Sequence, residues 1–377
     1  MRWAVAPWGG EAQLCRMPTS SRLLHAASLG AAARRLAPLA LALAGWWAVA
    51  EAFPARTRFL TQAPQPGSRW FKGNTHAHTL NSDGDSPPGV VAQWYKAHGY
   101  QFLVLSDHNV FTDPATLAAV MDTGFLLVPG EEVTTSWQGA GRRAEVHVNA
   151  LAVREVIPPV KDSTLLGTVQ RTVTRIREAQ AVPHINHPNF VWSLDTATLA
   201  QVRGDRLIEI YNGHPTVHNT GGGGWPGMEE AWDHLLTGGK VIYGIAVDDA
   251  HYFQGEFAAS RPNPGRGWVV VQAPRLETAA LMTALEAGHF YASTGVVLAE
   301  VVGTDSTLAV RIAPQGNFRY TTTFIGDGGR VLATDASLTP TYRLTGRERY
   351  VRARVTDSMG KQAWVQPLFT TRYRSVR

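Results

Sequence analysis

The sequence predicts an α/β fold, a barrel or a layered sheet, followed by a small domain of β-strands. From Trp70 onward, short apolar runs alternate with amphipathic stretches, as they do when strands alternate with covering helices. Histidines and carboxylates gather at the ends of these apolar runs, where barrel folds place their functional groups. After about Glu300 the pattern changes to alternating apolar and polar residues, which favours antiparallel strands.

Three parts are expected along the chain. Residues 1–52 are predicted to be a signal peptide or N-terminal anchor, residues 53–299 the α/β barrel, and residues 300–377 the C-terminal β domain. With 377 residues, 44% of them hydrophobic, the chain is long enough for one large core and a small second domain.

The N-terminal segment has the features of an export signal. Arg34 and Arg35 precede the apolar run Leu36–Ala50, which ends in Ala-Val-Ala. A basic start, an apolar stretch of about 15 residues and an A-x-A site predict secretion, and hence a periplasmic or extracellular location. The run is shorter than the roughly 20 residues of a membrane span. An uncleaved anchor is the alternative.

Cysteine content and charge exclude several classes of function. Cys15 is the only cysteine and lies in the leader, so the mature chain has no cysteine ligand or nucleophile, which fits an oxidising compartment. The formal net charge is +5, and residues 1–50 contribute +4 of it through five arginines and one glutamate, which leaves +1. Lysines and arginines form no cluster, so no nucleic-acid partner is expected.

Seven apolar runs are expected to be strands of the α/β domain. They are Phe71–His76, Phe102–Asp107, Phe125–Pro129, Val146–Val153, Val182–Asn186, Leu207–Tyr211 and Val241–Val247. Amphipathic segments predict helices at Val90–His98, Thr164–Ala179 and Met228–Leu236.

The C-terminal part is expected to resemble a small β-sandwich. Val351–Val355 alternates apolar and basic residues, which predicts a half-exposed antiparallel strand. Gly326–Gly329 predicts a hairpin turn. The glycine run Gly221–Gly224 predicts a flexible loop in the preceding domain.

His76 and His78 are the first sign of a metal site. Residues i and i+2 of a strand project from the same face, so one cation can bind both. Seven further side chains close, or lie beside, their own apolar runs, and with the first two they include six of the thirteen histidines. These seven are Asp83, His108, Glu132, His147, His187, Asp249 and His251.

This donor set suits two or three divalent ions. Imidazole and carboxylate without thiolate favour Zn, Mn or Fe. A carboxylate among several imidazoles can bridge two ions and hold a hydroxide between them. Ions about 3.5–4 Å apart activate water and neutralise charge on a phosphoryl or acyl oxygen. The expected substrate is therefore a small-molecule ester.

Seven short motifs occur in an order that resembles the PHP (polymerase and histidinol phosphatase) family of metal-dependent hydrolases. They are Asn74–Thr79, Ser82–Gly84, Ser106–Asn109, Pro129–Val133, His147–Asn149, Asn186–Pro188 and Asp248–His251. The resemblance covers roughly residues 70–295. It implies a distorted (β/α)7 barrel and a metal-bridging hydroxide as nucleophile, and most often phosphoesterase activity.

The resemblance also implies three metal positions. The first ion would be bound by His76, His78, Glu132 and Asp249. The second would be bound by Asp83, His108 and His251. The third would be bound by His147 and His187, with Glu132 bridging.

Two motifs offer adjacent or near alternatives. Glu131 and Glu132 point to opposite faces of a strand, and the family pattern selects Glu132, two residues after the glycine. His187 is preferred to His184 because a proline follows it in the matching motif. His184 is expected to support the site or to lie in the core.

Other polar residues are candidates for catalysis or support. Asp107 and Asp248 adjoin ligands and are expected to orient imidazoles, or else to cap a helix or a turn. Asp107, His184 and a metal-bound water are candidates for protonating the leaving group. Asn212 is expected either to face the pocket or to belong to a turn.

Arginines and two further histidines are candidates for substrate contact. Arg266 and Arg261 lie between the last ligands and the run Trp268–Val271, where a guanidinium could clamp an anionic oxygen; Arg266 is taken as the catalytic candidate. The competing candidates are Arg142 and Arg143, and the two histidines that could line the substrate are His214 and His218.

Alternative functions remain open. Tyr243–His251 and Gly288–Gly295 resemble the branch of the family that includes carbaryl-type carbamate hydrolases, in which a β domain follows the barrel. Carbamate or carboxyl-ester hydrolysis is therefore the alternative to phosphoester hydrolysis. An amidohydrolase barrel is disfavoured because no lysine lies at the expected position. A non-catalytic metal-stabilised binding module is the second alternative.

Overall fold

The computed structural model describes residues 66–373 and Ser375, all within one compact unit, Thr57–Arg377. The predicted export segment, residues 1–52, and Cys15 lie outside these residues. Within the described part of the chain, no helix has both the length and the apolar character needed to cross a membrane.

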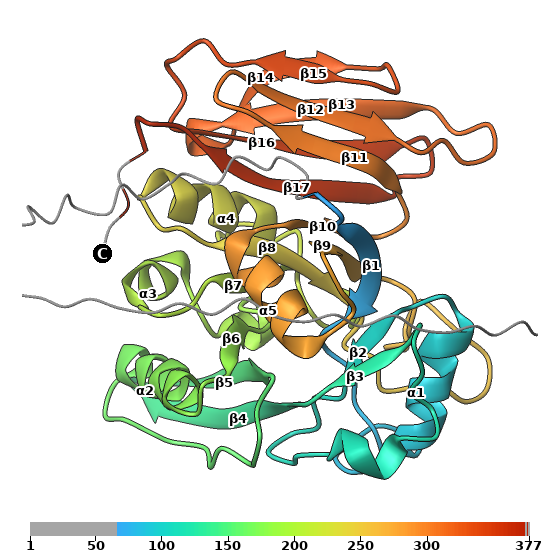
Figure 1. Ribbon diagram of the computed structural model, residues 1–377. Coiled ribbons are helices and arrows are strands. Elements are labelled where there is room, and N and C mark those ends of the chain that lie inside the picture. Colours follow the sequence, from blue (N-terminus) through green and yellow to red (C-terminus); the bar gives the residue numbers. More distant parts are fainter. Residues whose placement is uncertain (1–65, 374, 376–377) are drawn as a thin grey trace, which may run out of the picture. The chain divides into compact units, whose positions relative to one another are not determined.

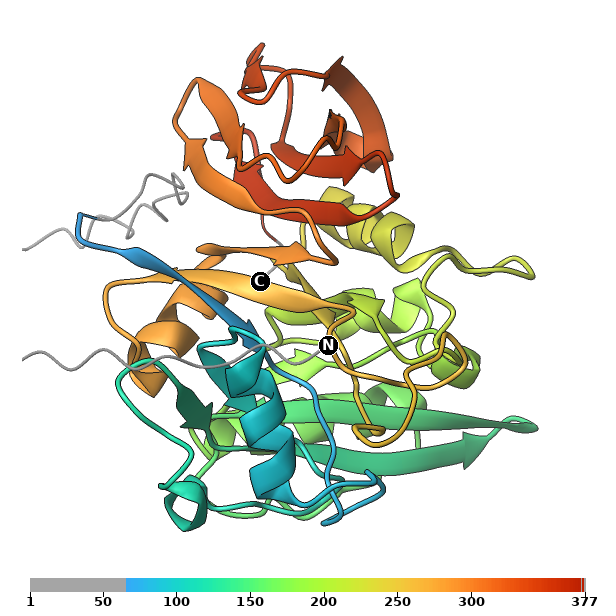
Figure 2. The same cartoon turned by 90° about the vertical axis from the view of Figure 1, so that its right-hand side faces the viewer.

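Five strands form one sheet of mixed direction (Figure 1). In spatial order they are β4 (Gly130–Gly139), β5 (Arg142–Leu151), β6 (Val182–Ile185), β7 (Leu207–Asn212) and β8 (Tyr243–Val247). The β4, β5 and β6 strands pair antiparallel, whereas β6, β7 and β8 pair parallel. Figure 2 shows the long β4–β5 hairpin, in green, extending past the other strands.

The largest sheet has nine strands and joins both ends of the described chain. In spatial order they are β14 (Arg330–Asp335), β13 (Tyr320–Gly326), β16 (Tyr350–Asp357), β17 (Gln362–Phe369), β10 (Phe290–Ser293), β9 (Trp268–Ala273), β1 (Arg69–Asn74), β2 (Phe102–Val104) and β3 (Leu126–Val128). The third sheet has the order β11 (Leu298–Gly303), β12 (Thr307–Ile312) and β15 (Thr341–Arg343).

Helices lie between the strands. They are α1 (Pro88–Ala97), α2 (Leu165–Glu178), α3 (Thr196–Gln201), α4 (Met228–Thr237) and α5 (Thr278–Ala287). The α1 helix packs on β2 and β3, and the other four contribute to the core of the five-stranded sheet. Three short 3₁₀ segments are η1 (Pro114–Leu117), η2 (Phe190–Trp192) and η3 (Asp327–Gly329).

Local chemistry explains the ends of two helices. The α2 helix begins where the Thr164 hydroxyl accepts from the Gly167 N–H at 2.9 Å, and its buried stripe includes Val169, Val173 and Ile176. The α5 helix ends at Gly288, whose φ of +75° is left-handed and whose missing Cβ leaves room for the Tyr243 ring.

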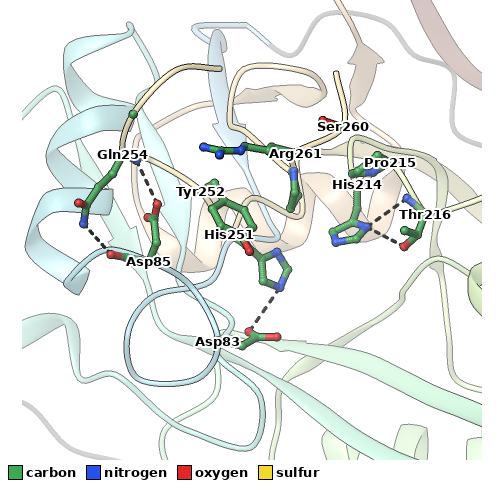
Figure 3. Close-up of a pocket in the computed structure, with 12 residues that line it drawn as sticks. Asp83, Asp85, His214, Pro215, Thr216, His251, Tyr252, Gln254, Ser260 and Arg261 are labelled. Atoms are coloured by element: carbon green, nitrogen blue, oxygen red, sulfur yellow. Dashed lines mark hydrogen bonds and ion pairs between the residues drawn. The ribbon is translucent and has the colours of Figure 1, made fainter. Parts of the chain in front are cut away.

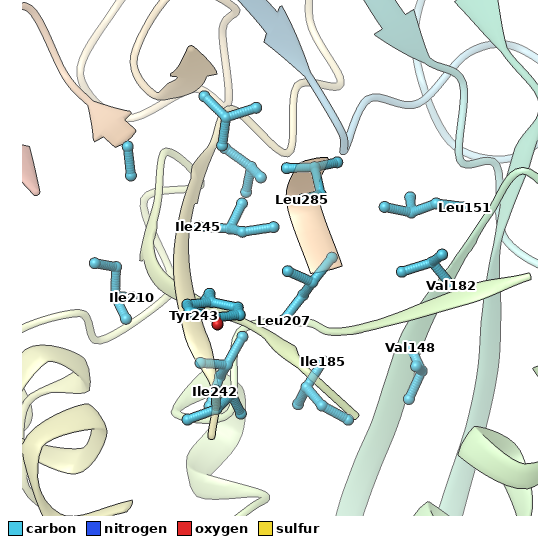
Figure 4. Packing of buried hydrophobic residues seen from close by; sticks show 14 of the residues in the cluster. Val148, Leu151, Val182, Ile185, Leu207, Ile210, Ile242, Tyr243, Ile245 and Leu285 are labelled. Atoms are coloured by element: carbon cyan, nitrogen blue, oxygen red, sulfur yellow. The ribbon is translucent and has the colours of Figure 1, made fainter. Parts of the chain in front are cut away.

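The core lies between the five-stranded sheet and its helices. Figure 4 shows this packing, with Val148, Ile185, Leu207 and Ile245 from four neighbouring strands meeting Leu285 of α5. All five side chains are completely buried. Each strand is held in place by apolar side chains from its neighbours, which fixes the ends of the strands where the polar residues lie.

The predicted α/β class is confirmed, but no continuous ladder closes the sheets into a barrel within residues 66–373. Instead, two isolated bridges link the sheets. Ala77, after β1, bridges Ala250, after β8, and His108, after β2, bridges Glu132 on β4. Both bridges lie at or beside candidate metal ligands.

The expected strands and helices agree with the structure, but β4, β10, α3 and α5 were not among them. The residues of β4 include Glu131, Glu132, Thr134 and Thr135, so no apolar run marks it. The strand forms because its whole length pairs with β5. The predicted Gly326–Gly329 turn and Val351–Val355 strand correspond to η3 and the middle of β16. The expected half-exposure of this strand is wrong, because Arg352 is buried and pairs with Glu229 of α4.

Residues 300–377 form strands, as expected, but most of these strands extend the sheet that contains β1. The β17 strand pairs with β10 through Tyr291–Val365, Ala292–Trp364 and Ser293–Ala363. The expected boundary at residues 299 and 300 therefore crosses a continuous arrangement of strands.

Candidate metal centre

The nine candidate ligands meet where strands and loops of the two large sheets come together. They fall into four overlapping groups whose ligand atoms lie within 4.8 Å of one another. The groups are His76, His78 and Asp249; His76, Glu132 and His187; His108, Glu132 and His147; and His78, Asp83, His108 and His251. No other described residue belongs to these groups, so all nine expected ligands lie together.

His76, His78 and Asp249 have ligand atoms spaced like those around one metal ion. His76 Nε2 lies 3.1 Å from His78 Nε2, and each lies 3.2 Å from Asp249 Oδ1. Each also lies 3.4 Å from Glu132 Oε2. Ligands at 2.0–2.1 Å from a tetrahedral zinc ion are about 3.3 Å apart. These residues therefore fit a divalent ion, as expected for the first position.

Glu132 contacts imidazoles on two sides. Its Oε2 atom faces His76 and His78, whereas Oε1 lies 2.9 Å from His147 Nδ1 and 3.4 Å from His187 Nε2. The side chain is completely buried, and Oε2 also lies 2.9 Å from His108 Nδ1. A buried carboxylate surrounded by imidazoles suits a shared cation.

Asp83 is the centre of the second group. Its carboxylate lies 3.3 Å from His251 Nε2, 3.5 Å from His108 Nε2 and 3.4 Å from His78 Nδ1. The side chain is 53% exposed, unlike Glu132, so this end of the cluster is open to the surface. The groups differ from the expected partition of ligands in two respects. His78 also belongs to this group, and His147 and His187, expected at one ion, fall in separate groups that share Glu132.

The charges in the cluster already favour bound cations. Burial acts to raise the pKa of Glu132, but His108, His147 and His76 hold it well below its ordinary value. Burial acts to lower the pKa of His76, but Asp249, Glu132 and Glu209 raise it well above the ordinary value. Three buried carboxylates thus create a negative field that a divalent ion would neutralise.

Two ligands have backbone conformations that side chains rarely adopt. The φ angle is +50° at Asp249 and +21° at His187. Each is held by a hydrogen bond, from Asp249 N–H to the His76 carbonyl and from His187 N–H to Glu209 Oε2. Such strain is retained where surrounding contacts determine the conformation, commonly at functional sites.

Glu209 and Asn212 lie behind the ligands. Glu209 Oε1 accepts from His76 Nδ1 at 2.7 Å, which directs His76 Nε2 toward the cluster. The Asn212 amide donates to Glu209 Oε2 at 2.8 Å and to Asp249 Oδ2 at 3.1 Å. Sequence reasoning did not identify Glu209. The one feature of the sequence that could have indicated Glu209 is its position as an acidic residue inside an apolar strand.

The structure distinguishes the two pairs of alternatives within the motifs, Glu131 from Glu132 and His184 from His187. Glu131 faces away from the ligands and accepts from the Ile157 N–H, while burial raises its pKa to about 7. His184 is buried with neither ring nitrogen hydrogen-bonded, and its Nε2 lies 3.4 Å from Glu209 Oε1. Neither residue belongs to a candidate metal group.

Asp107 and Asp248 hold backbone segments. The Asp107 carboxylate accepts from the Thr79 N–H and hydroxyl at 2.7 and 2.8 Å, and from the Ser82 hydroxyl at 2.8 Å. Asp248 accepts from the Arg266 N–H and from the Tyr95 hydroxyl. The alternative role expected for them, supporting turns, matches these contacts.

The candidate arginines differ in their partners. The Arg266 guanidinium donates to the carbonyls of Gly213, Ala258 and Ala259, so it joins two loops. The remaining three candidates have different surroundings: Arg142 donates to the Ser193 carbonyl, Arg143 pairs with Glu145, and Arg261 lines a pocket.

Two adjacent cavities adjoin the ligands. The smaller, about 120 Å³, lies among them and is also lined by Phe190, His214 and Val217. The larger, about 970 Å³, shares Asp83, His214 and His251 with it (Figure 3). His214 therefore lines both, whereas His218 stacks on Trp192 and lines neither.

Comparison with known proteins gives limited matches. No family model matches the chain. The 5'-3' exoribonuclease of Haemophilus influenzae, a curated relative, is 31% identical over 113 residues, which are 29% of this chain and 37% of that protein. The chain thus matches little more than a third of that relative's length.

Two solved structures are similar at low identity. A two-domain protein from Bacteroides vulgatus, containing a predicted PHP-like metal-dependent phosphoesterase, is 18% identical and covers 80% of this chain and 94% of its own, with a TM-score of 0.47. An amidohydrolase from Chromobacterium violaceum is 16% identical and covers 50% of this chain and 93% of its own, with a TM-score of 0.36. Identities below 25% and TM-scores below 0.5 give no evidence about chemistry, so the chemistry of the site is inferred from this chain's own residues.

Proposed function

We propose that the chain is a PHP-type metal-dependent hydrolase that acts on phosphate esters. The position of Glu132 carries the proposal, because its two oxygens contact imidazoles on opposite sides. A carboxylate so placed suits a bridge between two cations. The nitrogen and oxygen donors suit two or three divalent ions, with Zn, Mn and Fe as candidates.

Bound divalent ions would supply Lewis-acid activation of water and of the ester. The chain's own groups would hold the ester beside them. His214 Nδ1 accepts from the N–H and hydroxyl of Thr216, at 3.3 and 2.9 Å. The neutral ring then carries its proton on Nε2 and offers one donor to a substrate oxygen. Phe190 and Val217 exclude water from part of the smaller cavity.

Asp107 and Arg266, the candidate catalytic residues, are proposed to position the site. Asp107 fixes the turn that precedes Asp83, through Thr79 and Ser82. Arg266 ties the loop after His251 to the end of β7. Loss of either would displace ligands or pocket walls, and would lower activity without removing a group that touches the ester.

The likeness to an exoribonuclease supports a phosphodiester as the first substrate to test. That likeness covers 113 residues and 37% of the relative, so RNA itself is not part of the proposal. Export to the periplasm or the cell exterior is also proposed. It rests on the leader sequence, which lies outside the described residues.

Hydrolysis of two nitrophenyl substrates tests the proposal. The full chain is stripped with a chelator, reloaded with Mn or Zn, and assayed with bis(4-nitrophenyl) phosphate and with a 4-nitrophenyl carbamate. We expect phosphodiester turnover that chelation abolishes and metal restores. Turnover of the carbamate alone would replace the phosphoesterase proposal by carbamate hydrolysis.

The variant Glu132→Gln, with Glu131→Gln as its control, tests the bridging position. We expect Glu132→Gln to lose bound metal and nearly all turnover. Glu131→Gln should keep both, because an amide oxygen can still accept from Ile157. Full turnover in Glu132→Gln would contradict the bridging role. Metal binding without turnover of any ester in the unmodified chain would favour a binding module.

A further inference from the structure

A wide pocket lies directly beside the candidate metal centre. Its volume is about 970 Å³, within the range of small-molecule sites. Asp83, His214 and His251 belong both to its wall and to the cavity among the ligands. One substrate could therefore place its ester group at the metal ions and another part of the molecule in this pocket.

One wall of the pocket is a loop, residues 252–262, whose shape is fixed by hydrogen bonds with Asp85 and Asn263. Asp85 accepts from the N–H groups of Phe253 and Gln254 at 2.9 and 3.1 Å. Asn263 accepts from the Ala258 N–H at 2.9 Å and donates to the Tyr252 carbonyl at 2.8 Å. The loop therefore presents its side chains in a defined arrangement.

Arg261 is the loop residue that brings positive charge to the pocket. Its Cζ lies 5.9 Å from the centre of the Tyr252 ring. Among residues 66–373 the guanidinium has no carboxylate or carbonyl partner, in contrast to Arg266, whose donors are taken by backbone carbonyls. Figure 3 shows Arg261 extending over Tyr252 along the pocket wall.

The acidic residues of the same wall form no ion pair with Arg261. Both Asp85 oxygens accept from backbone N–H groups, which stabilise its negative charge. Asp83 is directed at His78, His108 and His251 and belongs to the metal centre. Arg261 is therefore the arginine of this lining whose guanidinium is available to a ligand.

We propose that this pocket holds one arm of the ester, and that Arg261 binds a second anionic group on that arm. The planar guanidinium binds a carboxylate or a phosphate through two parallel hydrogen bonds. Tyr252, 42% exposed, provides an apolar face for the part of the arm between the two anionic groups. The substrate class is thus an ester with a second carboxylate or phosphate. This inference rests on the proposed hydrolase function.

Matched diesters test the inference on the metal-loaded full chain. The parent is 4-nitrophenyl phenyl phosphate, and two derivatives carry a carboxylate or a phosphate group on the phenyl ring. We expect a higher kcat/KM for one or both derivatives than for the parent. Which derivative is preferred identifies the second anionic group.

Three arginine variants separate charge recognition from general damage. In Arg261→Gln, kcat/KM should fall about 10–100-fold more for the preferred derivative than for the parent, as expected for lost hydrogen bonds to a charged group. Arg261→Lys should recover part of that selectivity. Arg275→Gln, which alters an exposed arginine paired with Glu277, should preserve it. Equal falls for parent and derivatives would overturn the inference.

Direct binding distinguishes failure of the inference from failure of the proposed function. Calorimetry would measure binding of 3-carboxyphenyl phosphate to metal-loaded protein and to its Arg261→Gln variant. Weaker binding by the variant, with no turnover of any ester, would support the pocket and refute the hydrolase. Equal binding by both proteins would refute the role of Arg261, whatever the enzyme hydrolyses.

Discussion

Glu209 is a single buried carboxylate that supports three parts of the metal centre. It accepts from His76 Nδ1 and from the His187 N–H, both at 2.7 Å, and from the Asn212 amide at 2.8 Å. Burial acts to raise the pKa of Glu209, but the imidazoles of His76 and His184 lower it. Its negative charge is thus retained where it can fix the orientation of His76.

Replacing Glu209 by Gln is expected to weaken metal binding while preserving the fold. The variant keeps the side-chain shape but loses the charge that makes the His76 imidazole a better ligand, so metal affinity should fall about 10–100-fold. Competition with a chromophoric chelator measures the affinity, and circular dichroism measures the fold. Glu145→Gln, at a carboxylate paired with Arg143, serves as the control. Unchanged affinity would contradict the role of Glu209.

The ligands could be predicted from the sequence because each lies in, beside or after an apolar run and belongs to a recognisable motif. Glu209 could not, because it lies inside β7 between two buried isoleucines and belongs to no motif. The contacts of Asp107 with Thr79 and Ser82 also depend on how a turn folds back. The sequence alone did not contain that information.

At the scale of elements, a buried ion network joins α4 to β16. Arg352, 1% exposed, donates to both oxygens of Asp233 at 2.7 and 2.6 Å and to Glu229 at 2.9 Å. Its guanidinium also lies 4.8 Å from the centre of the Trp232 ring. The network fixes how the C-terminal strands meet the helix.

Arg352→Met is expected to destabilise the protein by about 3–5 kcal/mol, because it leaves Asp233 and Glu229 without their buried cation. Urea unfolding, followed by tryptophan fluorescence, measures the loss. Arg311→Met, which breaks the exposed pair with Glu300, should change stability by less than about 1 kcal/mol. Similar losses of unfolding free energy in the two variants would contradict the importance of burial for the contribution of this network to stability.

The turn after β15 is expected to make stability depend on acid pH. Glu348 accepts from the hydroxyls of Tyr342 and Thr345, both at 2.6 Å. Burial acts to raise the pKa of Glu348, but these hydrogen bonds lower it from 4.5 to about 2. A carboxyl whose pKa is lower in the folded protein stabilises the fold above its unfolded pKa, and that contribution is lost as pH falls through the folded pKa.

Glu348→Gln should therefore be less stable than the unmodified protein at pH 6, by about 1 kcal/mol after solvent screening. The difference should shrink as pH falls toward 3. Free energies of unfolding in urea at several pH values give this comparison. Glu300→Gln should show a small difference throughout. A gap for Glu348→Gln that widens on acidification would refute the assignment.

Elements with a strong apolar period could be predicted, and β4 could not. In α2, buried residues recur at helical spacing and a threonine caps the start, so local sequence is sufficient. The β4 strand carries Glu131 and Glu132 and owes its form to ten paired positions on β5. Such pairing is a long-range property, which periodicity within one segment does not report.

At the scale of the whole described chain, the nine-stranded sheet contains strands from both expected domains. Its order runs from β14 through β17 to β10, and then to β1 and β3. The Gln366 side chain on β17 also accepts from the Gly244 N–H at 2.9 Å and donates to the Gly244 carbonyl at 2.8 Å. Figure 1 shows β17 beside β10 and α4. Residues 300–377 thus support the strands that carry the ligands.

Removal of residues 300–377 is expected to prevent stable folding of the remainder. It would expose the edge of β10, leave the Asp233 carboxylate without Arg352, and uncover the Gly244 backbone groups. The shortened chain should therefore bind hydrophobic dyes, unfold without cooperativity and retain less than its full complement of metal. The full chain should unfold in one calorimetric transition. A shortened chain with its own sharp transition and undiminished metal content would show instead that the C-terminal strands form an independent domain.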